Sequence, residues 1–371
     1  MAYNSVRIIA YQVGTVGTKN NVDQNECECE CVYGIDPGEV ESPPKLYGDT
    51  NGLPKDAQTR IERLIKVIEL AYNSFKDQNS NETLKVFLAP EFYFRPNNNK
   101  YAYTQTEYKK IREVLTDTLC YLDIGHNWLI YAGTIVWCDA RNKIPHAANK
   151  RLNTDSINDN TDIYFNTCLM LQKRGGVLAQ PQNKVHVHSG DGIGSIDVRN
   201  RLGLQGAAAS EAFSEYTADK QFSKRQMSMG AIRFALEICV EHGSRFKALR
   251  RYLKNKPNSK FPDEIDLHFL VTAGKRINPK GVSAKVGGFF VRCDGSYDQI
   301  DNTQCEIFKV TGYQQSRIMG ADDTATTEAV EFRNAIPIDE DHGGLYLTSP
   351  KGCENKWFAQ SINISDPLKV S

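Results

Sequence analysis

Short apolar runs of strand length alternate with amphipathic segments of helix length in the first part of the chain. Val6–Val13, Leu84–Ala89 and Trp128–Gly133 are rich in β-branched and other apolar residues, which is typical of buried strands. The segments between them, 56–75 and 108–122, carry apolar residues at a spacing of three and four, so each predicts a helix with one buried face. This alternation predicts an α/β fold.

The first predicted helix has a cap, a buried face and an exposed face. Asp56 is placed to cap its N-terminus. The buried face is expected to consist of Ile61, Leu64, Ile65, Ile68, Ala71 and Phe75. We expect the opposite face to be exposed, with Glu62, Arg63, Lys66 and Glu69.

The later part of the chain adds antiparallel pairing and a strand that ends at a cysteine. Residues 162–171 and 177–179 flank a glycine turn, which predicts a hairpin that leads to Lys184. Apolar residues alternate with other types over 232–238, so a predicted strand runs directly into Cys239, and residues 244–253 can form a helix behind it. Further strands are expected at 266–271 and 287–292.

Composition suggests one large domain with two additions. The 371 residues are enough for a single large core. Residues from about 17 to 55 are rich in Asn, Asp, Glu, Pro and Gly, so we expect a surface insertion there. From residue 313 onward the chain is polar and weakly periodic. We therefore expect a domain over 1–312 and a C-terminal extension over 313–371, which packs on the domain or on an oligomer partner.

The charge balance and the distribution of cysteines narrow the possible classes of protein. Lys plus Arg and Asp plus Glu are 45 each, so no net field attracts nucleic acid or an anionic membrane. We see no signal peptide at the start and no apolar stretch of membrane-spanning length, and most of the ten cysteines are scattered as expected for reduced thiols, which favours the cytoplasm. Cys27, Cys29 and Cys31 alternate with glutamates, a spacing that suggests an exposed acidic loop or a local disulfide rather than a zinc knuckle.

Three segments supply groups for covalent hydrolysis, which needs an activated nucleophile, a base and a donor for developing negative charge. Glu91 follows a predicted strand, Lys184 follows a hairpin, and Cys239 ends a strand. Each alone has an ordinary structural explanation: an ion pair or helix cap, a solvated lysine, or a core cysteine.

Taken together, the three segments resemble the glutamate, lysine and cysteine motifs of the nitrilase superfamily, in that order. The segments are Phe87–Phe92, Asn183–Val187 and Leu236–Glu241, and the similarity extends over roughly residues 5 to 295. The resemblance implies a four-layer α-β-β-α sandwich that assembles into dimers or larger homo-oligomers. It also implies Cys239 as nucleophile, Glu91 as general base, and Lys184 with the Val240 backbone N–H as oxyanion donors, with no metal or organic cofactor.

The family often has a second acid after the lysine, and here Asp191 lies seven residues beyond Lys184. Its flanking glycines equally suit a turn aspartate, and Glu211 and Glu215 are the other candidates for the second acid. His186 and His188 lack an apparent third ligand for a metal site, so we expect them to have a structural role.

Three residues are candidates for the substrate pocket. Glu241 and His242 resemble the acidic residue and the His or Asn that follow the cysteine in true nitrilases, although Val240 replaces the tryptophan typical of that branch. Tyr93 lies beside Glu91, where it could line a pocket or simply pack in the core.

We expect hydrolysis of a small-molecule amide or nitrile to a carboxylic acid and ammonia or an amine, and we favour the amide because the nitrilase signature is incomplete. The alternatives are a protein side-chain deamidase, an N-acyltransferase, and a catalytically idle scaffold or interaction protein. A papain-like protease fits less well, because that family carries its cysteine on a helix.

Overall fold

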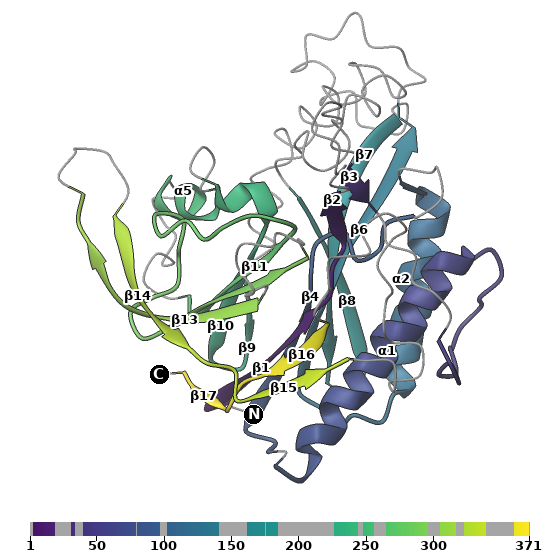
Figure 1. Ribbon diagram of the computed structural model, residues 1–371, viewed down its shortest axis with the longest axis horizontal. Helices are drawn as coiled ribbons and strands as arrows, with labels where there is room; N and C mark the ends of the chain where they lie inside the picture. The colour runs from purple at the N-terminus through teal and green to yellow at the C-terminus, as the bar shows by residue number, and fades with distance from the viewer. Residues whose placement is uncertain are drawn as a thin grey trace, which may run out of the picture.

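The computed structural model describes most of the chain. It covers residues 3–18, 31–33, 40–78, 80–96, 102–140, 162–174, 176–184, 226–243, 248–255, 265–295, 305–316, 323–338 and 360–370. Over these residues the protein is a mixed α/β fold with two large sheets and one small two-stranded sheet. Figure 1 shows the two long helices on one side of the larger sheet and the second sheet on its other side.

The nine-stranded sheet is built around strands that run in parallel. Its path is β15 (Asn334–Pro337), β16 (Ser361–Ile364), β1 (Ser5–Gln12), β4 (Thr83–Ala89), β6 (Trp128–Ala140), β7 (Asp162–Lys173) and β8 (Val177–Asn183), with β17 (Leu368–Lys369) beside β1 and β5 (Tyr103–Thr104) beside β6. β1, β4 and β6 are mutually parallel, whereas β7 and β8 pair antiparallel as the hairpin pattern predicted.

The six-stranded sheet contains the strand that ends at Cys239. Its order is β14 (Thr324–Val330), β13 (Cys305–Gln314), β12 (Phe289–Asp294), β11 (Leu267–Thr272), β10 (Ile232–Ile238) and β9 (Gln226–Met229). β10, β11 and β12 are parallel, so their carboxyl ends lie at the same edge. The small sheet pairs β2 (Val16–Thr18) with β3 (Cys31–Tyr33) in the expected insertion.

Two long helices cover one face of the nine-stranded sheet. α1 (Lys55–Phe75) and α2 (Gln105–Tyr121) share an apolar cluster with residues of β1, β4 and β6, including Ile9 and Phe87. The described residues also form the short helical segments η1 (Lys76–Gln78), η4 (Cys239–His242) and α5 (Ala248–Asn255).

The structure corrects two predictions for the first helix, its N-cap and its exposed face. The N-cap of α1 is Pro54, without a side-chain cap, and Asp56 lies in the first turn, where it accepts a hydrogen bond from Tyr103. α2 begins with a capping box between Thr104 and Glu107. Glu62 and Arg63 are buried rather than exposed, with Arg63 close to the phenol of Tyr11. Arg63 therefore contacts an interior side chain instead of solvent.

The two large sheets share one buried apolar cluster. Alternate residues of β1 divide between its faces: Ile8 and Ala10 contact the six-stranded sheet, and Ile9 and Tyr11 face the helices. Leu236 and Phe269 contribute from the second sheet. Because each fully buried side chain of this size contributes about 1.5–3 kcal/mol, this double burial of β1 and β4 stabilises the packing of the two sheets.

The residues expected to form a C-terminal extension, 313–371, provide strands to both sheets. β14 is the edge strand beside β13, and β15, β16 and β17 join the nine-stranded sheet next to β1. The expected boundary at residue 312 falls within β13. Among the described helices, none is both long and apolar enough to cross a bilayer.

Candidate active site

A tight turn at the end of β4 positions Glu91. Its backbone carbonyl accepts a hydrogen bond from Thr15 Oγ1 at 2.6 Å, and the next N–H, of Phe92, donates to Thr134 Oγ1 at 2.8 Å. Phe92 has φ 62°, a backbone conformation that L-residues rarely adopt. Gly133 packs against this turn, since a Cβ there would lie 2.7 Å from the Pro90 carbonyl oxygen. Hydrogen bonds thus fix the backbone of Glu91 and of the residue after it, and this positions the Glu91 side chain.

The Glu91 side chain is fully buried, with Lys184 and Asn166 among its polar partners. Lys184 Nζ lies 2.9 Å from Oε1, and Asn166 Nδ2 donates to the same oxygen at 2.8 Å. The lysine side chain is also fully buried. A buried carboxylate is stable in its charged form only when it is paired and hydrogen-bonded, and both conditions are met here.

The β7–β8 hairpin brings Asn166 and Lys184 side by side. Thr167 is paired with Asn183, and the Lys184 backbone N–H donates to the Asn166 carbonyl at 2.7 Å. Both side chains therefore project toward Glu91 from neighbouring strands. The strand that contains Asn166 was predicted, but Asn166 was not among the predicted site residues. Its one available signal was polarity in a buried strand run.

Cys239 occupies a strained bend at the end of β10. Its φ is 50°, in the left-handed region, and it is the first residue of the 3₁₀ turn Cys239–His242. The thiol side chain is partly exposed and packs against the apolar cluster between the sheets. Non-glycine residues in this conformation cost about 1–3 kcal/mol and are concentrated at functional sites.

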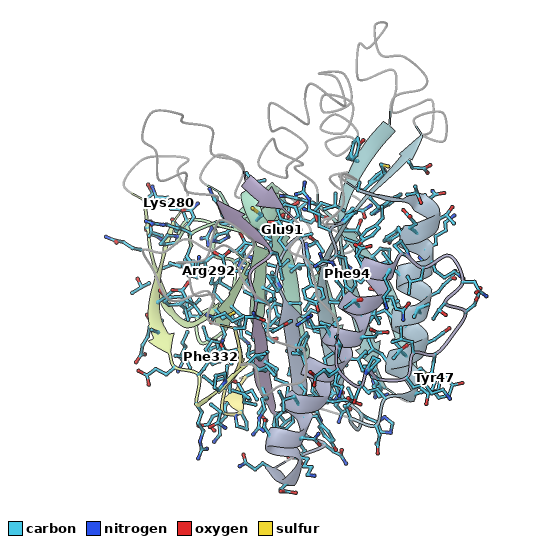
Figure 2. The ribbon with its side chains drawn as sticks, turned by 45° about the vertical axis from the view of Figure 1, so that its right-hand side comes forward. Tyr47, Glu91, Phe94, Lys280, Arg292 and Phe332 are labelled. Carbon is cyan, nitrogen blue, oxygen red and sulfur yellow. The ribbon has the colours of Figure 1, made fainter. Side chains whose placement is uncertain are left out.

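The strand ends that carry Glu91 and Cys239 meet at one edge of the sheet pair. Thr15, which holds the Glu91 carbonyl, donates its own N–H to Gly295 after β12 at 2.8 Å. Phe92 belongs to an apolar cluster against which Ala273 packs, just beyond β11. Because Val271 of β11 is paired with Ile238, the bend at Cys239 lies beside this contact. Figure 2 shows Glu91 within this end of the structure.

The three candidate pocket residues are all buried. Tyr93 packs on the helix side of the nine-stranded sheet and donates its hydroxyl to the Arg60 carbonyl at 3.1 Å. Glu241 and His242 are both fully buried. Glu241 accepts the Ile238 N–H at 2.7 Å and His242 Nδ1 contacts Glu237 at 2.7 Å, so both act on the protein's own groups.

Several predicted positions lie outside the described residues. These are Asp191, Glu211 and Glu215 as second acids, His186 and His188, and Cys27 and Cys29 of the cysteine cluster. Cys31 begins β3. Val240 lies in the 3₁₀ turn, and its carbonyl accepts the Gly243 N–H at 2.9 Å.

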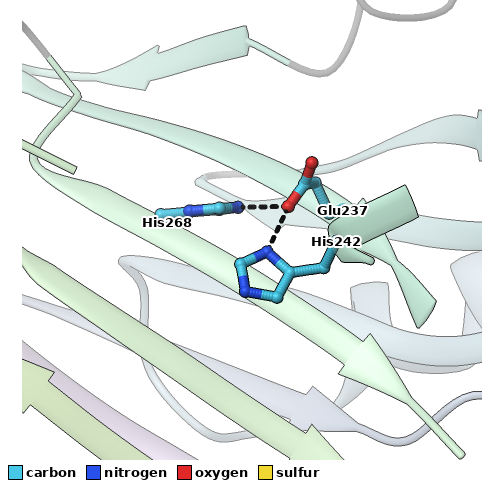
Figure 3. Close-up of side chains that lie close together, drawn as sticks. All are labelled: Glu237, His242 and His268. Atoms are coloured by element: carbon cyan, nitrogen blue, oxygen red, sulfur yellow. Dashed lines mark hydrogen bonds and ion pairs between the residues drawn. The ribbon is translucent and has the colours of Figure 1, made fainter. Parts of the chain in front are cut away.

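One group of side chains in the described part of the chain has the ligand types of a metal site. Glu237, His242 and His268 are buried, and one potential ligand atom from each lies within 4.8 Å of the others. Figure 3 shows both imidazoles directed at one carboxylate oxygen of Glu237. This group was not predicted, because His268 is 31 positions along the chain from Glu237 and the β10–β11 pairing brings the two together.

No protein family and no curated protein sequence matches this chain. Among solved structures, similarity extends over 79% of this chain and 77% of a Cys-to-Ala mutant of the amidase from Nesterenkonia sp. AN1 in complex with butyramide, with a TM-score of 0.34 and 14% identity. A Cys-to-Ala mutant of Nesterenkonia AN1 amidase from the nitrilase superfamily is similar over 80% of this chain and 76% of its own, with a TM-score of 0.32 and 10% identity.

Proposed function

We propose that this protein is a carbon–nitrogen hydrolase of the nitrilase superfamily, which cleaves a small amide through a thioester on Cys239. The observation that carries the proposal is the buried Glu91–Lys184–Asn166 cluster, placed at the edge where the bend at Cys239 also lies. A buried charge pair is costly to keep for stability alone, because well-packed apolar residues often serve as well or better. A catalytic role gives a reason for retaining it.

Acylation requires that the thiol lose its proton as sulfur attacks. Glu91 takes the proton from Cys239, and the thiolate forms a bond to the amide carbon. The negative charge that develops on the amide oxygen is stabilised by Lys184, whose ammonium has three donors, and by the Val240 N–H. The carbon–nitrogen bond then breaks, and Glu91 returns its proton to the departing nitrogen, which leaves as ammonia or an amine.

Deacylation uses the same groups with water. Glu91 takes a proton from a water molecule, whose oxygen attacks the thioester carbon, and the oxyanion forms again beside Lys184. Collapse releases the carboxylic acid, and the proton held by Glu91 returns to the sulfur of Cys239. The net change is one amide and one water converted to one acid and one amine.

In this proposal Asn166 orients Glu91, and Lys184 both orients it and contacts the substrate. Asn166 holds Oε1 at 2.8 Å and fixes the carboxylate, while Lys184 contacts the same oxygen from the adjacent strand. Lys184 can therefore orient the base and also donate to substrate. We further propose that the fold is the four-layer α-β-β-α sandwich, with α5 on the outer face of the second sheet. The hydrogen bond from Leu249 N to Glu237 supports this position of α5.

The test is ammonia release from a panel of short aliphatic and aromatic amides and nitriles. We expect turnover of at least one amide by the natural protein and none by Cys239→Ala. Cys120→Ala is the matched control, because Cys120 is an exposed thiol in α2 and should be dispensable. Turnover by Cys239→Ala at the natural rate would remove Cys239 as nucleophile. Silence across the panel by a correctly folded protein would contradict the small-amide substrate.

A further inference from the structure

Glu237 lies two residues before Cys239 and faces away from the apolar cluster between the sheets. Its neighbours in β10, Leu236 and Ile238, contribute to that cluster, so strand alternation places the Glu237 side chain on the outer face of the six-stranded sheet. The side chain is fully buried there. The proposed mechanism gives it no direct chemistry, yet an ionisable group is buried this completely only when its partners compensate for lost solvent.

The Glu237 carboxylate joins four elements around the cysteine bend. Oε2 lies 2.7 Å from His242 Nδ1 in the 3₁₀ turn and 3.1 Å from His268 Nε2 in β11. Oε1 accepts the backbone N–H of Leu249 in α5 at 2.9 Å. Figure 3 shows the two imidazole contacts converging on one oxygen. The strand before Cys239, the turn after it, the neighbouring strand and α5 therefore meet at one side chain.

The hydrogen-bond directions distinguish this network from a metal site. The Ser283 backbone N–H donates to His268 Nδ1 at 3.1 Å, so Nδ1 presents its lone pair and Nε2 carries the proton that faces Glu237. A metal ion on Nε2 would require removal of that proton while Nδ1 still faced a donor. Metal-bound histidines instead donate their second nitrogen to an acceptor. The contacts fit an ionised carboxylate that accepts the Leu249 N–H and lies within 3.1 Å of both imidazoles.

The pKa shifts of Glu237 and His268 agree with an ionised Glu237 carboxylate. Burial alone would raise the pKa of Glu237, but the hydrogen bonds and charges of His242 and His268 outweigh it, so that its pKa is well below the usual range. Burial lowers the pKa of His268, with the contact to Glu237 acting in the opposite direction. Glu237 is therefore the charged member of the network near neutral pH, whereas burial disfavours the charged form of His268.

The turn that Glu237 holds is the strained one. Cys239 has φ 50°, and such a conformation persists only where the surroundings over-determine it. Glu241 restrains the same bend through the Ile238 N–H, so two buried carboxylates act on it from opposite sides of Cys239 in the sequence. The His242 ring is confined by Gly281, where an added Cβ would lie 2.9 Å from the ring Cε1.

We propose that Glu237, acting through His242 and His268, is a positioning residue that holds the Cys239 backbone in its left-handed conformation and so aims the thiol. The proposal rests on the proposed role of Cys239 as nucleophile. In the Glu237→Gln variant the side-chain amide can no longer accept from every donor around it, and the bend is free to relax. A misplacement on the order of 1 Å at a nucleophile can cost about 100-fold in rate.

The experiment compares Glu237→Gln with the natural protein by two readouts. The first is the kcat and KM for whichever amide is turned over. The second is the rate at which iodoacetamide alkylates Cys239, followed by mass of the peptide that contains it. We expect kcat to fall about 100-fold with little change in KM, and the Cys239 alkylation rate to change markedly while that of Cys120 does not.

The matched control is Asp266→Asn, another buried carboxylate in the same sheet. Asp266 accepts the Arg233 N–H at 2.7 Å at the amino end of β10, away from the bend, and pairs with Lys285 at 2.7 Å. We expect this variant to lose stability without changing kcat or Cys239 alkylation. An equal effect of both variants on these readouts would show a general loss of structure and overturn the proposal.

A second pair of variants covers the case in which Glu237→Gln does not fold. Gly281→Ala presses on the His242 ring, and His268→Gln retains a donor toward Glu237. We expect Gly281→Ala to lower kcat and His268→Gln to lower it less. Unchanged kcat and alkylation in all folded variants would overturn the proposal, as would unfolding of all three.

Two further outcomes separate this proposal from its alternatives. A stoichiometric metal in the natural protein that is lost in Glu237→Gln would assign the three side chains to a metal site and overturn the positioning role. Alkylation needs no substrate, so it reports on Cys239 even if the proposed hydrolysis fails. Altered alkylation in Glu237→Gln, with hydrolysis retained by Cys239→Ala, would refute the proposed function and leave the positional effect standing.

Discussion

Lys184 Nζ lies 2.9 Å from Glu91 Oε1, and neither side chain is exposed to solvent. The pair joins the turn after β4 to the end of the β7–β8 hairpin, two segments 93 positions apart in the sequence. Each charge is compensated by the other, so removal of one partner leaves an unpaired charge in the interior. The pair therefore couples the stability of this edge of the sheet to the chemistry proposed for it.

Variants of Glu91 and Lys184 should separate the contribution of the pair to stability from its contribution to catalysis. Glu91→Gln should lower the free energy of unfolding by about 3–5 kcal/mol, because the Lys184 ammonium is then buried without its counter-charge. Adding Lys184→Met should recover most of that loss, since it removes the unpaired charge, but should not recover hydrolysis. Denaturant unfolding and ammonia release measure the two effects. Recovery of activity in the double variant would exclude both residues from the mechanism.

Asn166 should matter through the orientation of Glu91. Its removal in Asn166→Ala deletes one hydrogen bond to a charged group, worth about 1.5–3 kcal/mol. If that interaction is needed in the transition state, kcat falls by about 10- to 100-fold while KM changes little. Steady-state kinetics test this. A rise in KM at constant kcat would make Asn166 a substrate-binding residue instead.

Gly133 should be required for the shape of the Glu91 turn. Gly133→Ala places a Cβ 2.5 Å from the Tyr93 Cβ and 2.7 Å from the Pro90 carbonyl oxygen, at φ 78°. Gly52→Ala is the matched control, because Gly52 has the same φ and nothing within 4 Å. We expect Gly133→Ala to lower both melting temperature and kcat, and Gly52→Ala to produce only a small stability loss. Equal effects would show that backbone strain alone is responsible.

The lowered pKa of His268 predicts a pH dependence of stability. The unfolded-state pKa of histidine is about 6.5, and burial lowers the pKa of His268 in the folded protein. Below the unfolded value, the unfolded chain binds a proton that the folded protein does not, so the free energy of unfolding falls as the pH decreases. We expect His268→Gln to flatten this dependence between about pH 6.5 and 5. His126→Gln, at an exposed histidine, should leave it unchanged.

Local patterns predicted much of the fold because each strand and helix carries its own periodicity. β1, β4, β10 and the helices α1 and α2 lie where apolar spacing placed them. Glu62 and Arg63 of α1 were wrongly expected to be exposed, and Arg63 lies beside the phenol of Tyr11, which is distant in the sequence. A helical pattern records polarity and does not show what a polar group contacts.

The strands near the C-terminus, such as β14 and β16, were not predicted for a related reason. β14 is an edge strand with the sequence Thr-Ala-Thr-Thr-Glu-Ala-Val, largely exposed, so it has little apolar alternation. β16 pairs with β1 at sequence separations of 349 to 355 positions, and its register cannot be inferred from local spacing. The same limit applies to the Glu237 network, where β10 and β11 must pair before His268 reaches the carboxylate.

The proposed mechanism requires that substrate becomes covalently attached to Cys239. Rapid quenching with acid during amide turnover, followed by intact mass and peptide mapping, measures it directly. We predict a mass increase equal to the substrate minus its ammonia or amine, confined to the peptide that contains Cys239 and absent in Cys239→Ala. Amide turnover without any mass increase in the quenched protein, or a mass increase on another residue, would contradict a thioester on Cys239.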